Sequence, residues 1–314
     1  MEQPTDVQDV RVVHFGLGAL GASIARIVSE RTGLVSVAAY DTSSVHAGAD
    51  LGEAIGLHAM DIVVEGAGDT LRDVEADVVL YVPDGDLDAT TTDLELLLEA
   101  GLNVVAILPE LAYPPDEDDD DLAVSLDTLA REAEVTALAL DPGDALLGTL
   151  PLTLTSICSR VDRVTIRRRG PTNASGRLSL GSWARSLAES LGFLLDDLDE
   201  FEAEHGGVAG GHHRIEGSVE GREVLLVESF TEPSLAVASV EVEIEGVPSL
   251  QMTISGNSDA DQALATLAVN AIPAVLTGDP GLYALADLPP IHYWTSLGLM
   301  HASEDDDDDL DSDL

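Results

Sequence analysis

Residues 12 to 21 read Val-Val-His-Phe-Gly-Leu-Gly-Ala-Leu-Gly, and this stretch decides the fold. A short apolar run comes first, followed by glycines at 16, 18 and 21 and then by the helical pattern of residues 22–30. A strand, a glycine-rich turn and a helix in this order are typical of a dinucleotide-binding unit. The three glycines permit, in turn, the tight turn, the approach of a pyrophosphate to the backbone, and close packing of helix on strand. We therefore expect a cofactor-binding segment made of Gly16, Leu17, Gly18, Ala19, Leu20 and Gly21.

Short β-branched apolar runs alternate with helical patterns from residue 11 to residue 140, which predicts βαβ units around a parallel sheet. The clearest helix is expected from Leu87 to Ala100, with capping threonines and Gly101 at its end. The fold class is therefore α/β, with an N-terminal Rossmann-type, doubly wound parallel sheet. Its strands are expected at residues 11–15, 35–40, 61–65, 77–82, 103–108 and 135–140.

The pattern changes after Asp141-Pro142-Gly143, where a helical stretch to Cys158 leads into strands with alternating polarity. Such alternation suits an antiparallel sheet with one covered face, and a last helix is expected over residues 259–276. The expected strands cover residues 161–169, 222–230, 237–245 and 249–255. We therefore predict a dinucleotide-binding domain (1–141), a C-terminal α+β substrate and oligomerisation domain (142–258), a segment that packs back on the first domain (259–300), and a disordered acidic tail (301–314).

The chain is strongly acidic: 59 acids face 14 bases, the formal net charge is −45 at pH 7, and every base is arginine. Such a surface repels nucleic acid and anionic membranes, so neither is an expected partner. Concentrated cations would screen the self-repulsion, which favours the protein of an extreme halophile; an acidic mesophilic protein is the alternative. The run from Asp116 to Asp121 is expected in a solvated loop.

The apolar runs and the single cysteine limit where the protein is expected in the cell and which disulfides or metal sites it can form. No apolar run reaches the roughly 18 residues of a membrane span, and the first ten residues lack the pattern of a signal peptide, which favours a cytoplasmic protein. Cys158 is the only cysteine, so neither an intrachain disulfide nor a cysteine-based metal cluster can form. Diffuse carboxylates without a shaping turn are weak ligands, so no metal is expected.

Asp41 follows the second expected strand, 20 positions after Gly21. A carboxylate at this place accepts hydrogen bonds from the adenosine ribose and repels a 2′-phosphate, which favours NAD over NADP while use of both stays open. Arg31 comes too early in the unit to be an obvious partner for that phosphate. The alternative is a packing turn followed by a surface aspartate.

Several short motifs then occur in order between about Val10 and Pro290. They are Gly16 to Gly21, Leu108-Pro109-Glu110-Leu111-Ala112-Tyr113-Pro114, Asp141-Pro142-Gly143, Cys158-Ser159-Arg160-Val161-Asp162-Arg163 and Val269-Asn270-Ala271-Ile272-Pro273. Together they resemble the 2,4-diaminopentanoate dehydrogenase group, which is related in fold to dihydrodipicolinate reductases. The resemblance implies an NAD(P)-dependent oxidoreductase that moves hydride between a nicotinamide and a carbon bearing nitrogen, with a small amine or imine as its substrate.

The chain departs from these families in two places. Dihydrodipicolinate reductases carry a His-His pair followed by a lysine that serves the imine substrate, whereas here Arg214 follows His212 and His213. An arginine does not release its proton near neutral pH. The diaminopentanoate group usually shows Asn-Pro-Gly-Phe where this chain has Asp-Pro-Gly-Asp at residues 141–144.

Three residues are candidates for the chemistry. His212 and His213 follow the glycine-rich stretch 206–211, which we expect to be a flexible loop that closes over substrate, and an imidazole there could exchange a proton with the substrate nitrogen. Glu110 follows the fifth strand, at the sheet edge where open α/β folds bind ligands, and could hold a substrate ammonium group or the nicotinamide carboxamide. The alternative for His212 and His213 is an exposed loop without a chemical role. The alternative for Glu110 is a helix cap or a contact that closes a loop. Pro83 and Pro109 are expected to line the cofactor channel.

Five of the fourteen arginines fall between Arg160 and Arg169, and three of them, Arg163, Arg167 and Arg169, share one strand face. They could bind a substrate carboxylate. However, glutamates alternate in the same way at 241, 243 and 245, so we favour a cross-strand ladder or a subunit interface. An interface there would make the protein a homodimer or homotetramer.

The alternative function is a non-catalytic dinucleotide-binding sensor or regulatory protein. The absence of lysine and of a strong acid–base constellation favours it. A dehydrogenase for a sugar or hydroxy acid would need a base that the sequence does not identify.

Overall fold

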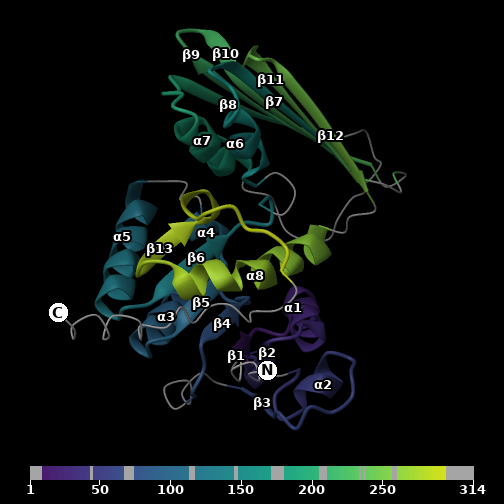
Figure 1. The fold of residues 1–314 in the computed structure, drawn as a ribbon, viewed down its shortest axis with the longest axis vertical. Coiled ribbons are helices and arrows are strands. Elements are labelled where there is room, and N and C mark those ends of the chain that lie inside the picture. Colours follow the sequence, from purple (N-terminus) through teal and green to yellow (C-terminus); the bar gives the residue numbers. More distant parts are fainter. Residues whose placement is uncertain are drawn as a thin grey trace, which may run out of the picture.

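The structure, a computed structural model, describes residues 9–42, 45–66, 74–112, 117–144, 148–170, 180–204, 211–232, 235, 238–256 and 260–294. Two sheets, each with its own helices, follow one another along the long axis of the molecule (Figure 1). In this part of the chain no helix combines the length and apolar character needed to cross a membrane.

The first sheet has seven strands in the order β13-β6-β5-β4-β1-β2-β3, all paired in parallel. The chain thus winds outward from β1 in both directions, so the predicted Rossmann-type sheet is confirmed. The strands are β1 (Val10–Phe15), β2 (Leu34–Tyr40), β3 (Val64–Glu65), β4 (Val78–Tyr81), β5 (Asn103–Ile107), β6 (Thr136–Leu140) and β13 (Gly281–Ala284).

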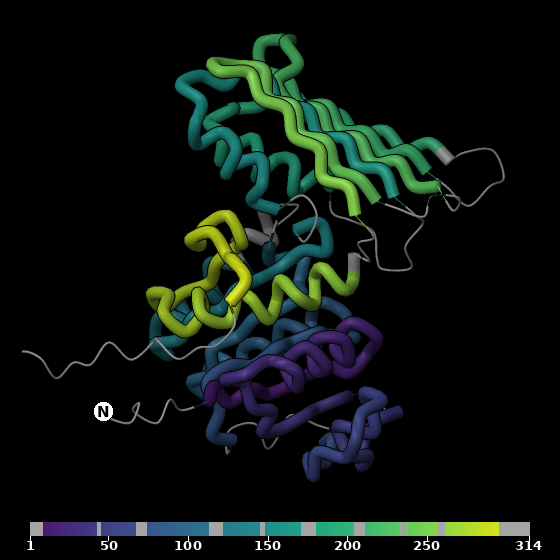
Figure 2. The backbone as a smooth tube through the Cα atoms, turned by 45° about the vertical axis from the view of Figure 1, so that its right-hand side comes forward, coloured from purple at the N-terminus to yellow at the C-terminus, as the bar shows by residue number. Residues whose placement is uncertain are grey.

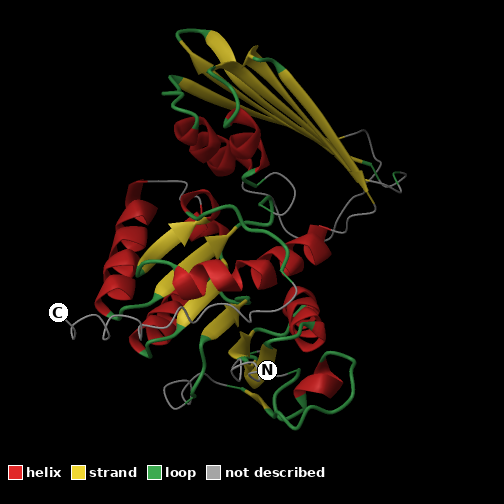
Figure 3. Ribbon diagram, in the orientation of Figure 1, coloured by secondary structure: helices red, strands yellow, loops and turns green. Residues whose placement is uncertain are grey.

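Helices cover both faces of this sheet (Figure 3). Helices α1 (Ala19–Glu30) and α8 (Ala260–Thr277) pack on the face that carries Val78 and Leu80. Helices α3 (Leu87–Glu99) and α5 (Glu117–Glu132) pack on the face that carries Val79 and Tyr81. Since successive strand residues point to opposite faces, both sets are buried, which is why the strands read as continuous apolar runs in the sequence.

The acidic run of residues 116–121 is not the loop that the sequence predicted. Residues 117–121 begin helix α5, whereas Asp116 lies outside the described residues. Acidic residues are favourable in the first turns of a helix because the free N–H groups there carry partial positive charge. A run of acids is therefore compatible with a helix start as well as with a solvated loop.

Helix α3 begins with an aspartate cap instead of the expected threonines. The Asp86 carboxylate accepts a hydrogen bond from the backbone N–H of Ala89 at 3.0 Å. Thr91 and Thr92 donate their hydroxyls to the carbonyls of Leu87 and Asp88, one turn earlier in the same helix. The helix ends before Gly101, whose φ of +75° confirms the predicted C-terminal glycine.

After α8 the chain adds β13 to the edge of the first sheet, a strand that the sequence did not reveal. The short 3₁₀ helix η2 (Leu285–Asp287) and a segment to Trp294 follow. Arg31 links this segment to α8: it donates to Asn270 Oδ1 of α8 at 3.3 Å, and its guanidinium carbon lies 4.9 and 4.7 Å from the ring centres of Tyr293 and Trp294. The predicted tail, residues 301–314, lies outside the described residues.

The second sheet has six strands in the order β12-β11-β7-β10-β9-β8 (Figure 2). The prediction of a purely antiparallel sheet was wrong, because β7 and β10 pair in parallel. Two of its strands, β8 and β9, were not predicted. The strands are β7 (Arg160–Gly170), β8 (Asp197–Glu204), β9 (Gly211–Val219), β10 (Arg222–Thr231), β11 (Ala238–Val247) and β12 (Leu250–Gly256).

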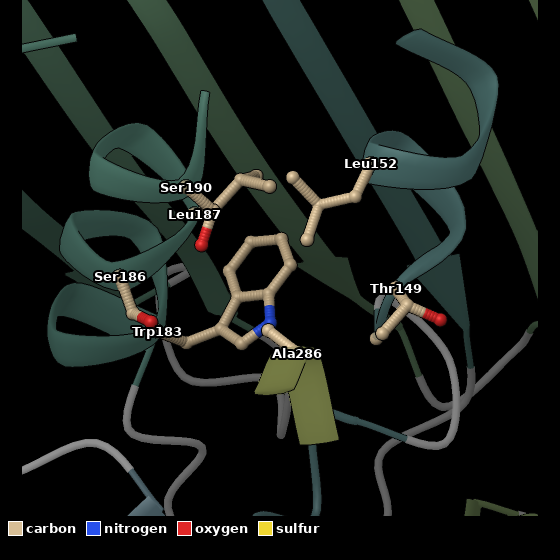
Figure 4. Close-up of a pocket in the computed structure, with 8 residues that line it drawn as sticks. Thr149, Leu152, Trp183, Ser186, Leu187, Ser190 and Ala286 are labelled. Carbon is tan, nitrogen blue, oxygen red and sulfur yellow. The ribbon is translucent and has the colours of Figure 1, made fainter. Parts of the chain in front are cut away.

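The inner face of the second sheet is apolar and packs on helix α7 (Leu180–Ser190). Trp183 lies on this helix and is 2% exposed. It lines a small pocket with Thr149 and Leu152, at helix α6 (Leu150–Thr155), and with Ala286 of η2 (Figure 4). Because η2 directly follows β13 of the first sheet, this contact joins the two units.

Candidate active site

Two of the three glycines in the first turn are required by the fold. Gly16 has φ +91°, and a Cβ added there would lie 1.9 Å from the carbonyl oxygen of Val82. A Cβ at Gly21 would lie 1.9 Å from the carbonyl oxygen of Gly16. The tight turn and the close helix–strand packing therefore need glycine at both positions.

Gly18 is different, because neither backbone conformation nor packing requires it. Its φ is −57°, and an added Cβ would meet no protein atom within 4 Å. It is the N-cap residue of α1, and no side chain caps the helix there, so free N–H groups and the positive end of the helix dipole face outward. This open cradle fits the pyrophosphate of a dinucleotide.

Asp41 lies at the same edge of the sheet as the glycine turn. It follows β2 directly, and the last residue of β2, Tyr40, pairs with Phe15 at the end of β1. Asp41 is 3% exposed, and its N–H donates to the carbonyl of Glu65 at 2.8 Å. It is therefore not the surface aspartate of the alternative interpretation. Arg31 is engaged by the C-terminal segment instead.

Pro83, Pro109 and Glu110 line one pocket at the carboxyl ends of β4 and β5. Val82 donates its N–H to the carbonyl of Phe15 at 2.7 Å, so the pocket adjoins the glycine turn. Glu110 is exposed and lies in the first turn of α4 (Pro109–Ala112). The structure therefore brings together three side chains that the sequence singled out separately. The other lining residues are Gly85, Leu87, Thr90, Ile107 and Leu108.

His212 and His213 lie in strand β9, which begins at Gly211. Of the flexible loop predicted at 206–211, Gly211 therefore belongs to a strand, whereas residues 206–210 lie outside the described part. The ring of His212 stacks on Phe230 with centroids 4.2 Å apart, and its Nε2 lies 3.4 Å from Glu228. His213 Nε2 lies 2.5 Å from Glu200 Oε1. These contacts lie within the second sheet, whereas Glu110 lines a pocket at the edge of the first.

The predicted ladder of opposite charges between the arginines and glutamates is confirmed. Register places Arg163 opposite Glu245 and Arg167 opposite Glu241 in the adjacent strands β7 and β11. Arg163 bonds Glu245 at 3.0 Å and also contacts Glu223. Arg167 reaches Glu228, Glu243 and Glu241 at 3.2, 3.5 and 4.0 Å. Arg169 is the exception: its guanidinium lies over the Phe230 ring at 5.3 Å.

A buried acidic turn ends β6, and sequence reasoning noted it only as a departure from related proteins. The carboxylate of Asp144 accepts a hydrogen bond from the N–H of Asp141 at 2.8 Å, and Asp141 in turn accepts from the N–H of Gly143 at 2.5 Å. The two aspartates are 4% and 1% exposed. The acid at position 144 therefore closes the turn, a task that a phenylalanine could not perform. The Asp-Pro-Gly-Asp spacing was the available signal.

Tyr81, at the end of β4, is a second polar group that the sequence did not reveal. Its hydroxyl donates to Asp93 Oδ2 at 3.1 Å. Burial, together with the neighbouring Asp93, raises the pKa of Tyr81 far above its ordinary value, and burial also raises the pKa of Asp93. The tyrosine hydroxyl therefore stays protonated and acts as a hydrogen-bond donor at working pH.

Comparison with known proteins shows what the chain is similar to. Residues 195–302 match the family model of the 2,4-diaminopentanoate dehydrogenase C-terminal domain. The chain is 25% identical to 2,4-diaminopentanoate dehydrogenase of Acetoanaerobium sticklandii, over 90% of this chain and 94% of that protein. The chain is an NAD(P)-dependent oxidoreductase that is similar to 2,4-diaminopentanoate dehydrogenase. The resemblance seen in the sequence is thereby confirmed, and the alternative of a non-catalytic sensor is not supported.

Solved structures show the same fold over most of the chain. Amine dehydrogenase from Mycobacterium smegmatis superposes with a TM-score of 0.75 at 21% identity, covering 92% of this chain and 98% of that one. Dihydrodipicolinate reductase from Paenisporosarcina, solved with dipicolinate bound, gives a TM-score of 0.57 at 16% identity, covering 89% and 99%. Both support an α/β chain with a Rossmann-type first unit and a separate C-terminal sheet.

Proposed function

We propose that this oxidoreductase acts on a small amine or imine, with the reacting carbon held at the pocket of Pro83, Pro109 and Glu110. The observation that carries the proposal is the position of Glu110, an exposed carboxylate on a pocket beside the glycine turn. The names of the relatives, a diaminopentanoate dehydrogenase and an amine dehydrogenase, support the substrate class.

In this proposal the glycine turn binds a nicotinamide dinucleotide, which donates or accepts the hydride. The turn residues Leu17, Ala19 and Leu20 and the free N–H groups at the start of α1 hold the pyrophosphate. Asp41 binds the adenosine ribose and makes NAD the preferred cofactor, with NADP possible. Pro83 and Pro109 shape the channel in which the nicotinamide lies.

Glu110 is proposed to hold the substrate nitrogen and to take its proton. A carboxylate attracts an ammonium or iminium group by charge. An amine must be neutral before hydride leaves the adjacent carbon, so a base at the nitrogen is needed, and Glu110 offers one at the edge of the pocket. The imidazole of His213 is hydrogen-bonded to Glu200, and that of His212 lies beside Glu228 in the second sheet, so we assign the proton transfer to Glu110.

The test is turnover of NAD⁺ or NADP⁺ with a panel of diamines, amino acids and hydroxy acids, using purified protein in concentrated KCl. We expect oxidation of at least one amine, and a loss of about 10²- to 10⁴-fold in kcat/KM for Glu110→Gln, the range typical of a general base. His212→Gln serves as the control and should stay within threefold of the parent. Turnover of hydroxy acids alone, or full activity in Glu110→Gln, would contradict the proposal.

We also propose that the protein assembles as a homodimer or homotetramer through the outer face of the second sheet. On this face Arg163, Arg167 and Arg214 pair with glutamates and neutralise part of the negative charge, while the whole chain carries −45. Two strongly acidic copies repel each other least where their charges are balanced. Light scattering in concentrated KCl should give a multiple of 32.9 kDa, and Arg167→Glu should lower it. A monomeric parent protein would overturn this proposal.

The composition further supports a cytoplasmic protein adapted to concentrated salt. Fifty-nine acids without a single lysine make intramolecular repulsion strong until cations screen it. The midpoint of thermal unfolding should therefore rise steadily between dilute and molar KCl. A midpoint that does not depend on salt would contradict the adaptation.

A further inference from the structure

The pocket beside the glycine turn has a second polar side chain besides that of Glu110. Of its eight lining residues, only Glu110 and Thr90 carry side chains that form hydrogen bonds. Thr90 lies in the first turn of α3 and is 2% exposed, so it is a buried polar wall of the pocket. Gly85 lines the same pocket, and a Cβ added there would lie 3.7 Å from Thr90 Oγ1. The missing side chain therefore leaves this oxygen open toward the pocket.

The Thr90 hydroxyl belongs to a chain of three polar side chains. Tyr81, at the end of β4, is 1% exposed, and its hydroxyl donates to Asp93 Oδ2 at 3.1 Å. Burial and then the charge of Asp93 raise the pKa of Tyr81, whereas a hydrogen bond from the Thr90 hydroxyl acts in the opposite direction. Thr90 and Asp93 lie three residues apart on α3 and so share one face of the helix. The chain therefore runs from the pocket at Thr90, through Tyr81, to the half-buried Asp93.

The direction of these hydrogen bonds follows from the number of protons available. An ionised carboxylate only accepts, and a phenol has a single proton, so the proton of the Tyr81 hydroxyl is committed to Asp93. The phenol oxygen can then only accept, which leaves Thr90 as the donor between the two hydroxyls. Once its own proton points to Tyr81, the oxygen of Thr90 offers only lone pairs to the pocket. Thr90 is therefore a hydrogen-bond acceptor for a bound group.

We propose that the Thr90 hydroxyl accepts a hydrogen bond from the N–H of the nicotinamide carboxamide, and that Tyr81 and Asp93 position it for this task. The inference rests on the proposed function, in which Pro83 and Pro109 of the same pocket shape the nicotinamide channel. A carboxamide offers N–H donors without a charge, so an uncharged acceptor suits it, whereas a charged substrate nitrogen is better matched by the carboxylate of Glu110. An acceptor held in one direction sets the orientation of the carboxamide and thereby the ring face that meets the substrate.

The experiment compares the affinities of NADH and of its reduced acetylpyridine analogue, in which a methyl group replaces the carboxamide nitrogen and the carbonyl is kept. Fluorescence titration in concentrated KCl, without substrate, gives both dissociation constants. The parent protein should bind NADH about tenfold more tightly than the analogue, which is the order expected for one hydrogen bond. In Thr90→Val, which keeps the shape without the acceptor, NADH should bind about tenfold more weakly, and binding of the analogue should change less than about threefold.

The matched control is Thr92→Val. The Thr92 side chain is exposed on the same helix, and its hydroxyl donates to the carbonyl of Asp88 at 3.0 Å. Both dissociation constants should stay within about threefold of the parent values in this variant. If Thr90→Val does not fold, Thr90→Ala replaces it with the same expected loss. An unchanged preference for NADH in the folded Thr90 variant overturns the proposal, and so does a parent protein that binds the two compounds equally.

Tyr81→Phe tests the positioning role, because it leaves Thr90 in place and frees the threonine proton to turn toward the pocket. The preference for NADH over the analogue should fall by at least about threefold. A loss of affinity that is equal for the two compounds would contradict the positioning role, since a purely structural defect weakens both alike.

Failure of the proposed function gives a different result. A parent protein that binds neither dinucleotide refutes the cofactor site itself, and the role of Thr90 falls with it. A parent protein that prefers NADH but oxidises no amine refutes the proposed substrate class, whereas loss of that preference in Thr90→Val would still support the role of Thr90.

Discussion

The two sheets of this molecule are stabilised in different ways. The parallel sheet is covered by helices on both faces, and its strands are mainly apolar. The mixed sheet is apolar on the face that packs on α7, while its outer face carries the ladder of arginines and glutamates. Burial of apolar side chains therefore determines how the strands of the first sheet pack, whereas matched charges help to determine which strands pair in the second.

The sharpest test of the first sheet lies in its opening turn. Gly16→Val should lower the free energy of unfolding by about 4 kcal/mol or more, because the new side chain would clash with the Val82 backbone and demand a left-handed conformation. Gly18→Val should change stability by less than about 1 kcal/mol, because the position is open. Denaturant unfolding measures the stability of both variants. Equal losses of stability would show that the turn does not need glycine at position 16 more than at position 18.

The same pair of variants tests the binding role of the turn. In Gly18→Val, NADH affinity measured by fluorescence should fall about 100-fold, because the new side chain would occupy the place of the pyrophosphate. A folded Gly18→Val protein with unchanged affinity would refute the cofactor site.

The buried core of the first sheet should show its own pH dependence. Burial lowers the pKa of His14 to about 4, and its Nε2 lies 2.9 Å from the Ser36 hydroxyl. Since the unfolded chain binds the proton near pH 6.5 and the folded chain only near pH 4, stability falls across this window as the pH drops, by about 3 kcal/mol in total. His14→Asn removes this contribution. Unfolding curves of parent and variant that run parallel between pH 7 and pH 4 would contradict it.

For the second sheet, the test is to remove the charge of Arg167, the arginine at the centre of the ladder on the outer face. Arg167→Gln should destabilise the protein by about 1–2 kcal/mol, because Glu228, with a side chain only 11% exposed, loses a charged partner. Arg160→Gln should change stability by less than about 0.5 kcal/mol, since the Arg160 side chain is 64% exposed and its partner is Asp162. Thermal unfolding at fixed KCl compares them, and a larger effect at Arg160 would contradict the ladder's role.

The smallest expected effect concerns cofactor choice. Asp41→Ser should shift the ratio of NAD to NADP use by about tenfold toward NADP, because the repulsion of the 2′-phosphate is removed. Initial rates with both cofactors measure this ratio. An unchanged ratio would show that Asp41, which is buried after β2, acts only in packing.

The sequence predicted the first sheet well because its signals are local. Each strand is a short apolar run, and the glycines at 16, 21 and 101 mark turns that only glycine satisfies. Strand β13 escaped prediction because its four residues acquire strand character only by pairing with β6. Strands β8 and β9 escaped because polar residues such as Glu200, His213 and Arg214 interrupt the apolar pattern, and their partners lie on neighbouring strands.

The residues of the candidate site also fall into those that local sequence signals predicted and those that only the structure revealed. The positions of Pro83, Pro109 and Glu110 followed from the rule that ligands bind at the carboxyl edge of a parallel sheet, and the structure places all three on one pocket. The strand that carries His212 and His213 was not predicted, because the preceding glycines suggested a loop beside them, whereas pairing with β10 makes this stretch a strand. The period of two already placed Arg168 on the opposite strand face from Arg167 and Arg169, but only the structure shows that its face is the buried one.

By itself, the sequence determined the parallel sheet, the cradle at the start of α1, the outer charge ladder and the acidic character of the surface, because these depend on neighbours along the chain or on simple periodicity. Only the tertiary structure decided which arginine is buried, which histidines lie beside glutamates, and which residues share a pocket. Those properties arise between segments distant in sequence, where burial and the nearest charge set the energy of each side chain.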